Sequence, residues 1–149
     1  MSKPFLIAKN KKAYFNYEIL STIEAGIVLK GPEIKSIREH NLSLTEAFIL
    51  IRNHEIFIYN FFIKRYPFTT HVKDLEETRT RKLLLHAAEI NRLEKNVKQE
   101  RLNLIPLKLY LKNNRAKIEI GVGRAKKNYD KREVIKKREQ ARHLQKYKD

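Results

Sequence analysis

The apolar side chains of this 149-residue chain stop abruptly at Gly123, and this boundary limits what part of it can fold. Nearly all Val, Ile, Leu and Phe residues precede it, whereas residues 124–149 carry eleven Lys or Arg against four Asp or Glu. About 120 residues are enough to bury a single hydrophobic core. We therefore predict one folded domain, residues 1–123, followed by a basic tail, residues 124–149.

The whole chain is strongly basic, with a formal net charge of +16. Such a chain repels itself unless a polyanion neutralises it, so nucleic acid is the leading predicted partner. An anionic membrane surface is the alternative, but the apolar stripe of the tail is thin for a membrane-bound helix and no apolar run is long enough to span. The absence of cysteine and of a signal peptide predicts a cytoplasmic location.

Short alternating or apolar segments predict about six strands, at residues 14–23, 27–30, 48–52, 56–66, 105–111 and 116–123. The first two are expected to pair across a turn at 24–26, where Gly26 supplies a positive φ or a bulge. The last two form the clearest hairpin, with Ile105, Leu107 and Leu109 pointing inward and Pro106 and Lys108 outward.

Two helices are predicted between these strands. Residues 31–38 begin with Pro32 and Glu33 in the first turn, as helices commonly do, and leave Lys35 and Arg38 on an outward face. An apolar stripe predicts a second helix over residues 78–98. Arg79, Arg81 and Lys82 would oppose the dipole at its start, so we interpret them as a phosphate-binding group rather than a solvated edge.

This element order predicts a mainly β fold with helices (α+β). We expect an oligonucleotide-binding-type closed antiparallel barrel of about six strands with two to three helices, and a β-sandwich is the alternative. The tail has a thin helical stripe of Val134, Ala141 and Leu144 and many like charges. We expect it to be disordered in isolation and helical on a polyanion.

Catalytic and metal-binding motifs are not found in the sequence. The five histidines lack ligand spacing and the four glycines form no phosphate-binding loop, so neither a metal nor a cofactor is predicted. The Glu33-Ile34-Lys35 segment resembles half of a Mg²⁺-dependent nuclease site, but no Asp precedes Asp74. We expect a non-enzymatic binding protein, and a nuclease is the enzymatic alternative.

Several segments, in order over nearly the whole chain, resemble the small protein B family, the SsrA-binding or tmRNA-binding proteins. They are residues 10–13, 24–27, 31–38, 80–85, 106–110, 116–122, 126–127 and 130–132. The resemblance implies an oligonucleotide-binding barrel that holds the tRNA-like part of tmRNA during trans-translation on stalled ribosomes. It also implies a tail that enters the empty mRNA channel and folds there as a helix. We expect a monomer, and a protein bound permanently to rRNA is the alternative.

The predicted site residues form two sets. The resemblance places Asn10, Glu24 and Leu84 on the tmRNA-facing surface, and the full RNA-binding set is Asn10, Lys11, Glu24, Lys35, Arg38, Arg79, Arg81, Lys82 and Leu84. The ribosome-binding tail set is Lys126, Lys127, Tyr129, Asp130, Lys131, Arg132, Lys136 and Arg138. Tyr129, an aromatic residue among cations, is expected to stack on an RNA base. The chain departs from the family pattern at Arg101 and Ala125, where glycine is usual.

Overall fold

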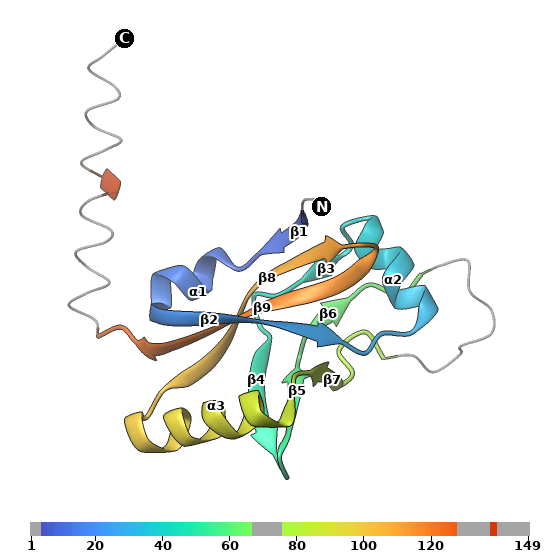
Figure 1. The fold of residues 1–149 in the computed structure, drawn as a ribbon. Coiled ribbons are helices and arrows are strands. Elements are labelled where there is room, and N and C mark those ends of the chain that lie inside the picture. The colour runs from blue at the N-terminus through green and yellow to red at the C-terminus, as the bar shows by residue number, and fades with distance from the viewer. Residues whose placement is uncertain (1–3, 67–75, 128–137, 140–149) are drawn as a thin grey trace.

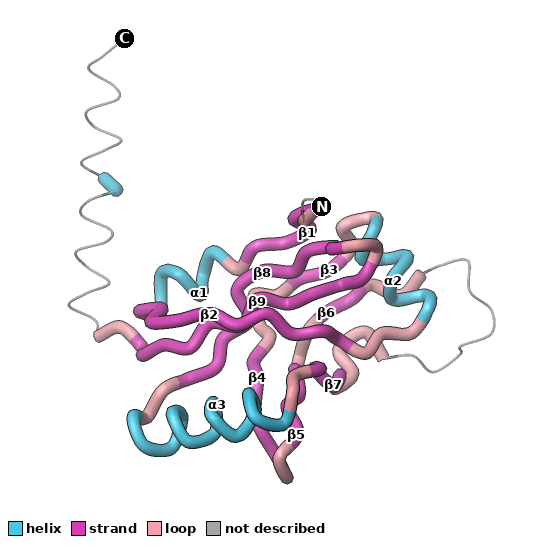
Figure 2. Tube along the Cα trace, viewed as in Figure 1, coloured by secondary structure: helices cyan, strands magenta, loops and turns pink. Residues whose placement is uncertain are grey.

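A curled antiparallel sheet forms the centre of the computed structural model, which describes residues 4–66, 76–127 and 138–139 (Figure 1). Its strand order is β1-β8-β9-β2-β7-β5-β4. The strands are β1 (Phe5–Lys9), β2 (Tyr17–Ile27), β4 (Phe48–Arg52), β5 (Glu55–Tyr59), β7 (Arg81–Leu84), β8 (Asn103–Lys112) and β9 (Arg115–Ala125). Two short strands, β3 (Leu42–Ser43) and β6 (Phe62–Ile63), pair with each other. Helices α1 (Lys11–Asn16), α2 (Gly31–Arg38) and α3 (Ala87–Glu100) lie at the margins of the sheet (Figure 2).

The curl of the sheet brings strand β4 close to β8, although the two are far apart in strand order. Within the described part of the chain, no hydrogen-bonded ladder joins them. The strands and helices of the structure confirm the prediction of a mainly β fold with helices. Closure of the sheet into a complete barrel is not shown.

The two faces of the sheet differ in burial because side chains alternate along strands such as β5 and β7. Ile56, Ile58, Ile118 and Ile120 point inward and are fully buried, together with Leu83 at the centre of the core. Their neighbours along the same strands point outward. The predicted site residues that lie in strands can therefore be assigned to the core or to the outer face: Glu24, Arg81, Lys82 and Leu84.

Strand β2 corrects the prediction for the N-terminal segment. The turn predicted at residues 24–26 is wrong, because β2 continues through it and pairs with β9 from Tyr17 to Gly26. Gly26 does not have a positive φ. A Cβ at this position would lie 3.3 Å from the Cβ of Leu84, so its role is close packing against β7. Strand β1 and helix α1 were not predicted.

The long helix predicted over residues 78–98 is also wrong in its first part. Residues Arg81–Leu84 form strand β7, which pairs with both β5 and β2, and α3 begins only at Ala87. The backbone N–H of His86 donates to the Glu89 carboxylate at 3.2 Å, which caps this helix start. Pairing on both sides outweighed a local sequence pattern that equally fits a helix.

The predicted strand at residues 56–66 and the predicted hairpin differ from the structure in detail. The strand divides into β5 and β6 around Asn60, which has a φ of 57°. The β8–β9 hairpin is confirmed and turns through Asn113 and Asn114, both with positive φ. Pro106, which was predicted to point outward, is buried beside a register shift between Pro106 and Lys108. Its neighbours Ile105 and Leu107 are buried as well, in a separate cluster with Ala13 of α1.

The two departures from the family pattern fall at element ends. Arg101 follows α3 in the left-handed conformation, with a φ of 53°, where glycine has no steric cost. Ala125 is the last residue of β9 and lies opposite Tyr17. Strand β9 therefore continues two residues beyond the predicted domain boundary at Gly123.

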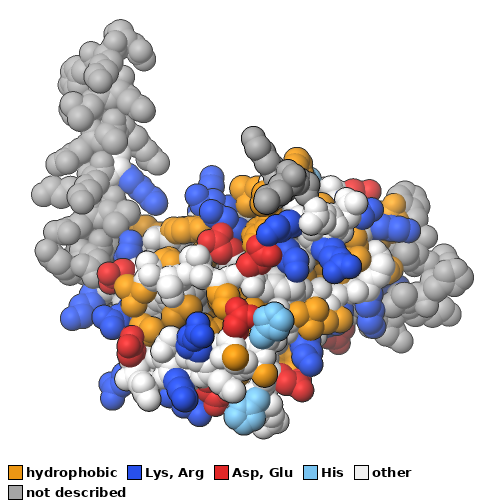
Figure 3. All heavy atoms as spheres, viewed as in Figure 1, with side chains coloured by type: hydrophobic (Ala, Val, Ile, Leu, Met, Phe, Trp, Pro, Cys, Tyr) orange, Lys and Arg blue, Asp and Glu red, His pale blue; other side chains and the backbone are white. Residues whose placement is uncertain are grey.

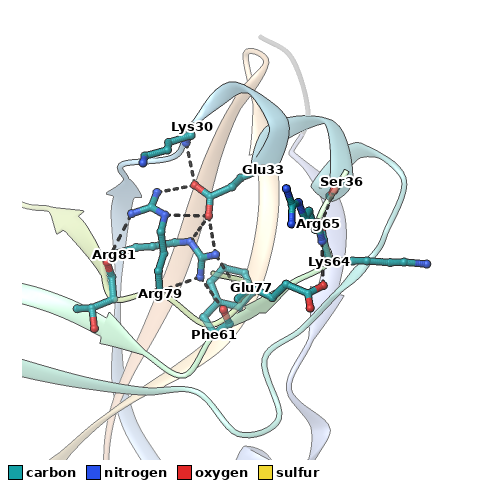
Figure 4. A network of polar contacts seen from close by, with 10 residues as sticks. Lys30, Glu33, Ser36, Phe61, Lys64, Arg65, Glu77, Arg79 and Arg81 are labelled. Carbon is teal, nitrogen blue, oxygen red and sulfur yellow. Dashed lines mark hydrogen bonds and ion pairs between the residues drawn. The ribbon is translucent and has the colours of Figure 1, made fainter. Parts of the chain in front are cut away.

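A buried ionic cluster fastens helix α2 to the sheet (Figure 4). Glu33 accepts hydrogen bonds from Arg79 Nε at 3.1 Å and from Arg81 Nε at 2.6 Å. Arg81 also donates to the carbonyl oxygens of Phe61 and Glu77, which belong to two further segments. The cluster therefore joins α2, strand β7 and the chain on either side of β6.

The charge of Glu33 is stabilised in the folded state. Burial by itself raises the pKa of this carboxyl, but hydrogen bonds from Arg79, the Lys30 backbone and Arg81 outweigh it and hold the pKa below its usual value. Because the pKa is lower in the folded than in the unfolded state, the resulting stabilisation is present above the unfolded pKa. It is lost as the pH falls through the folded value.

Replacing Glu33 by glutamine should cost about 3–5 kcal/mol in the free energy of unfolding, because it leaves buried guanidinium groups without a counter-charge. Urea denaturation followed by circular dichroism would measure this. Glu39→Gln at the exposed end of the same helix is the control and should change stability by less than about 0.5 kcal/mol. Below about pH 4.3 the wild type should lose stability more steeply than Glu33→Gln. Equal losses for the two variants at neutral pH would contradict this account.

Candidate RNA interface

Three of the predicted RNA-binding residues share the outer face of strands β2 and β7. Leu84 lies opposite Gly26, and Glu24 is two residues from Gly26 on the same side of β2. Lys82 is two residues from Leu84, so its side chain lies on the same side of β7, and it is exposed. Strand pairing therefore brings Glu24, Lys82 and Leu84 onto one surface, which we call the β2–β7 face.

A shallow pocket lies on this face. It has a volume of about 320 Å³ and is lined by Glu24, Gly26, Leu84, Leu85, His86, Glu89 and Lys117. Leu84 contributes an exposed apolar side chain, while Glu24 and Lys117 add an acceptor and a cation. Such a combination can contact the apolar surface of a base, its hydrogen-bonding edge and a nearby phosphate.

The Glu24 carboxylate is held in place by strand β8. The Tyr110 hydroxyl donates to Glu24 Oε2 at 2.5 Å, and Lys112 Nζ lies 3.7 Å from the same oxygen. Burial raises the pKa of the Tyr110 phenol, and the hydrogen bond and negative charge of Glu24 raise it further. Tyr110 therefore stays protonated and orients the carboxylate. The sequence motifs did not indicate this residue as part of the site.

Two predicted contact residues lie in the interior instead. Asn10 is 4% exposed and its amide donates to the carbonyl oxygens of Leu44 and Pro106, at 3.3 and 3.0 Å. Its side-chain oxygen caps α1 by accepting from the Ala13 N–H at 3.2 Å. Arg81 is 1% exposed and bound within the Glu33 cluster. Arg81 thus supports strand β7 from the inside, whereas Asn10 fastens the start of α1 to Leu44 and to strand β8.

The predicted phosphate-binding group at a helix start therefore requires correction. Arg79, Arg81 and Lys82 lie in or just before strand β7 rather than in a helix. Arg79 and Arg81 are both committed to Glu33, which leaves Lys82 as the exposed cation of the three. Lys35 and Arg38 are exposed on helix α2, outside the β2–β7 face, and the Lys35 ammonium lies 5.4 Å from the Tyr66 ring centroid.

A second basic surface surrounds helix α1. A groove of about 610 Å³ is lined by Lys9, Lys11, Lys12, Tyr14, Phe15 and Arg138. The Lys9 ammonium lies 4.9 Å from the Tyr14 ring, and the Arg138 guanidinium 5.5 Å from the Phe15 ring. Figure 3 shows Lys and Arg side chains distributed over this face of the molecule, interspersed with apolar and acidic ones. Tyr14 and Phe15 were expected in a strand, so their part in this groove was not foreseen.

The tail begins beside the α1 surface. The Lys126 N–H donates to the Asn16 carbonyl oxygen at 2.8 Å, and its ammonium donates to the Tyr14 carbonyl oxygen at 3.3 Å. Lys127 follows and is exposed. Arg138 lines the α1 groove. The remaining predicted tail residues lie outside the described residues: Tyr129, Asp130, Lys131, Arg132 and Lys136. The predicted tail stripe of Val134, Ala141 and Leu144 also lies outside them.

The Glu33-Ile34-Lys35 segment, which resembles half of a nuclease site, has a structural role in this protein. Glu33 is enclosed by two arginines rather than open to a cation, and Lys35 is exposed on the outward side of α2. The described residues contain no group of three or more His, Cys, Asp or Glu side chains that could hold a metal ion. They also contain no helix with the length and apolar character needed to cross a membrane.

Comparisons with known proteins agree over nearly the whole chain. The family model described as "SmpB protein" matches residues 7–149. The SsrA-binding protein of Mycoplasma mycoides subsp. mycoides SC is 59% identical over 137 residues, which is 92% of this chain and 93% of that protein. The SsrA-binding protein of Mesoplasma florum is 58% identical over 144 residues, or 96% and 97% of the two chains.

A similar solved structure is described as "tmRNA-SmpB: a journey to the center of the bacterial ribosome". It matches with a TM-score of 0.67 and 37% sequence identity, and the match covers 86% of this chain and 93% of that chain.

The contact between Tyr110 and Glu24 can be tested by titration. The Tyr110 phenol should ionise at a higher pH than a free tyrosine, because burial and the carboxylate disfavour the phenolate. The difference in ultraviolet absorbance between the wild type and Tyr110→Phe over an alkaline pH series isolates this group. Glu24→Gln should lower its apparent pKa, whereas Glu55→Gln on strand β5 should not. An unchanged titration in Glu24→Gln would contradict the assigned contact.

Proposed function

Because this chain belongs to the SmpB protein family, we propose that it binds the tRNA-like part of tmRNA and delivers it to stalled ribosomes for trans-translation. The observation that carries this proposal is the family match over residues 7–149, which includes both the domain and the tail. The similar solved structure, described as tmRNA-SmpB in the bacterial ribosome, supports the same two partners. The net charge of +16 suits a protein that works between two RNA surfaces.

The β2–β7 face is proposed as the surface that binds tmRNA. Glu24, Lys82 and Leu84 lie together there, and Glu24 is oriented by Tyr110. Leu84 is 52% exposed, which suits contact with the flat surface of a base or sugar. Arg81 is a positioning residue for this face, since it ties β7 to Glu33 and to the Phe61 carbonyl oxygen from the inside. Asn10 positions the start of α1 against strand β8.

The tail is proposed to bind the ribosome, where it enters the mRNA channel when no message fills it. Its eleven basic residues suit an RNA-walled channel, and Tyr129 would stack there on a base. It begins beside α1, through Lys126, rather than on the β2–β7 face. Because the tail leaves the domain away from the β2–β7 face, one chain can contact tmRNA and the ribosome at the same time.

The protein is proposed to act by binding rather than by catalysis, in the cytoplasm where ribosomes work. A permanently rRNA-bound protein is the rival function, and a nuclease is the enzymatic one. The RNA that copurifies with the chain distinguishes them. Transfer-messenger RNA supports the proposal, ribosomal RNA alone supports the rival, and Mg²⁺-dependent RNA degradation supports a nuclease.

Variants of the β2–β7 face should weaken binding to a fluorescent tRNA-like fragment of tmRNA, measured by anisotropy over a salt series. Leu84→Ala removes an apolar contact and should weaken affinity roughly tenfold without changing the salt dependence. Lys82→Gln should weaken affinity and reduce the slope of log K against log salt by roughly 0.7–0.9 for each lost phosphate contact. Lys95→Gln on helix α3 is the control. Wild-type affinity in both face variants would rule out this surface.

Removing the tail should separate the two roles of the chain. The truncation is best placed after Lys127, because strand β9 runs to Ala125 and Lys126 is bonded to the chain around α1. This form should bind the tRNA-like fragment within about threefold of the full chain if most phosphate contacts lie in the domain. It should fail to support peptide tagging on ribosomes stalled in a reconstituted translation system. In the full chain, Tyr129→Ala should impair tagging and Tyr129→Phe should preserve it.

A further inference from the structure

An aromatic cluster lies on the outer surface of the β4–β5 hairpin. The Phe48 and Tyr59 rings are stacked, with centroids 5.2 Å apart and planes 8° from parallel. Phe57 meets the edge of Tyr59 at 6.5 Å, and the Arg52 guanidinium lies 5.5 Å from the Tyr59 centroid. Three aromatic rings and one cation are thus gathered on two paired strands.

These rings are not part of the core. Ile49, Ile56 and Ile58 fill the inner side of the hairpin, while Phe48 remains 45% exposed and Leu50 40%. Seven large apolar side chains are exposed among the described residues, and four of them lie on this side of the sheet: Val28, Phe48, Leu50 and Leu84. A contiguous exposed apolar surface of this kind marks a binding site more often than a chance arrangement.

Strand register makes this cluster continuous with the β2–β7 face. Leu50 lies opposite Phe57, and Phe57 lies opposite Lys82 in the next strand. The Val28 N–H donates to the Lys82 carbonyl oxygen at 2.9 Å, which continues the row onto the end of β2. Leu84 is two residues from Lys82 and on the same side. One outer surface therefore runs from Glu24 to Phe48.

The charges along this surface favour RNA over a protein partner. Lys82 stands in the middle of the row, whereas the centre of a protein–protein interface is depleted of lysine. The Lys82 ammonium lies 3.6 Å from the Glu55 carboxylate, and both side chains are about half-exposed. An RNA phosphate can therefore replace this carboxylate at little cost in free energy. Arg52 supplies a second cation beside the rings. Aromatic faces flanked by cations are the typical binding surface for unpaired bases.

We propose that Phe48 and Tyr59 form a stacking platform for an unpaired base of the same tRNA-like RNA that the β2–β7 face binds. Phe48 offers its exposed ring to the base and Tyr59 supports that ring from the other side. Arg52 and Lys82 hold the flanking phosphates. The inference rests on the proposed function and extends its RNA contact across β7 and β5 to the sheet edge at β4.

Substitution of Phe48 in the full-length chain tests the platform, with the fluorescent tRNA-like fragment of tmRNA as the probe. Phe48→Ala should weaken binding roughly 5- to 100-fold, the range expected for loss of one base stack. The salt dependence should stay unchanged, because stacking releases no counterions, whereas Arg52→Gln should reduce it. Phe48→Leu keeps apolar area but no ring and should bind weakly, while Phe48→Tyr should bind like the wild type.

Phe5→Ala is the matched control, because Phe5 is 60% exposed on strand β1, away from this surface. Circular dichroism melting would verify that each variant is folded. Wild-type RNA affinity in folded Phe48→Ala, or full affinity in Phe48→Leu, overturns the platform. If Phe48→Ala binds like the wild type while Lys82→Gln and Leu84→Ala weaken binding, the platform fails but the proposed function stands. If the wild type fails to bind the fragment, the proposed function itself fails.

Discussion

The ion pairs of Glu33 with Arg79 and Arg81, which are largely removed from solvent, hold in position the strand that carries the surface proposed to bind RNA. Burying charges is costly, and it is tolerated only where each charge has a counter-charge and its remaining hydrogen-bonding groups are satisfied. Glu33 meets this condition with Arg79, Arg81 and the Lys30 backbone, and Arg81 also binds the Phe61 and Glu77 carbonyl oxygens. This cluster determines how β7 enters the sheet, and β7 carries Lys82 and Leu84.

Because side chains alternate along strand β7, its inward residues support the fold and its outward residues form the surface proposed to bind RNA. Arg81 and Leu83 point into the protein, while Lys82 and Leu84 point out of it. Because a strand reverses its side chains at every residue, a shift of one position would bury the lysine and expose the arginine. The Glu33 cluster opposes such a shift, since Arg81 has charged and carbonyl partners only in the observed register. The residues that stabilise the fold and those proposed to bind RNA thus lie on the same four-residue strand.

The two basic surfaces differ in chemistry as well as in place. The β2–β7 face combines isolated cations with apolar side chains and an oriented carboxylate, which suits a folded RNA with defined contacts. The α1 surface and the tail that begins beside it carry dense positive charge with few acidic residues, which suits a looser hold on RNA backbone. This division is compatible with an adaptor that remains on one RNA while it enters a site made of another.

Local sequence patterns were enough to locate helix α2, strand β4, the β8–β9 hairpin and the position where the apolar residues end. These features follow from capping, alternation and turn chemistry between near neighbours. Glu24 and Leu84 were proposed as RNA contacts from the ordered family motifs, and Lys82 from its charge; strand pairing brings all three to one face. Tertiary structure alone decided that residues 81–84 are a strand and that residues 17–27 run straight through the predicted turn. In both places the local pattern fits two structures, and hydrogen bonding to neighbouring strands selects one. The same pairing placed Arg81 inside, because a strand residue's face depends on its register with distant partners. Asn10 is buried at the start of α1, where its amide binds the carbonyl oxygens of Leu44 and Pro106.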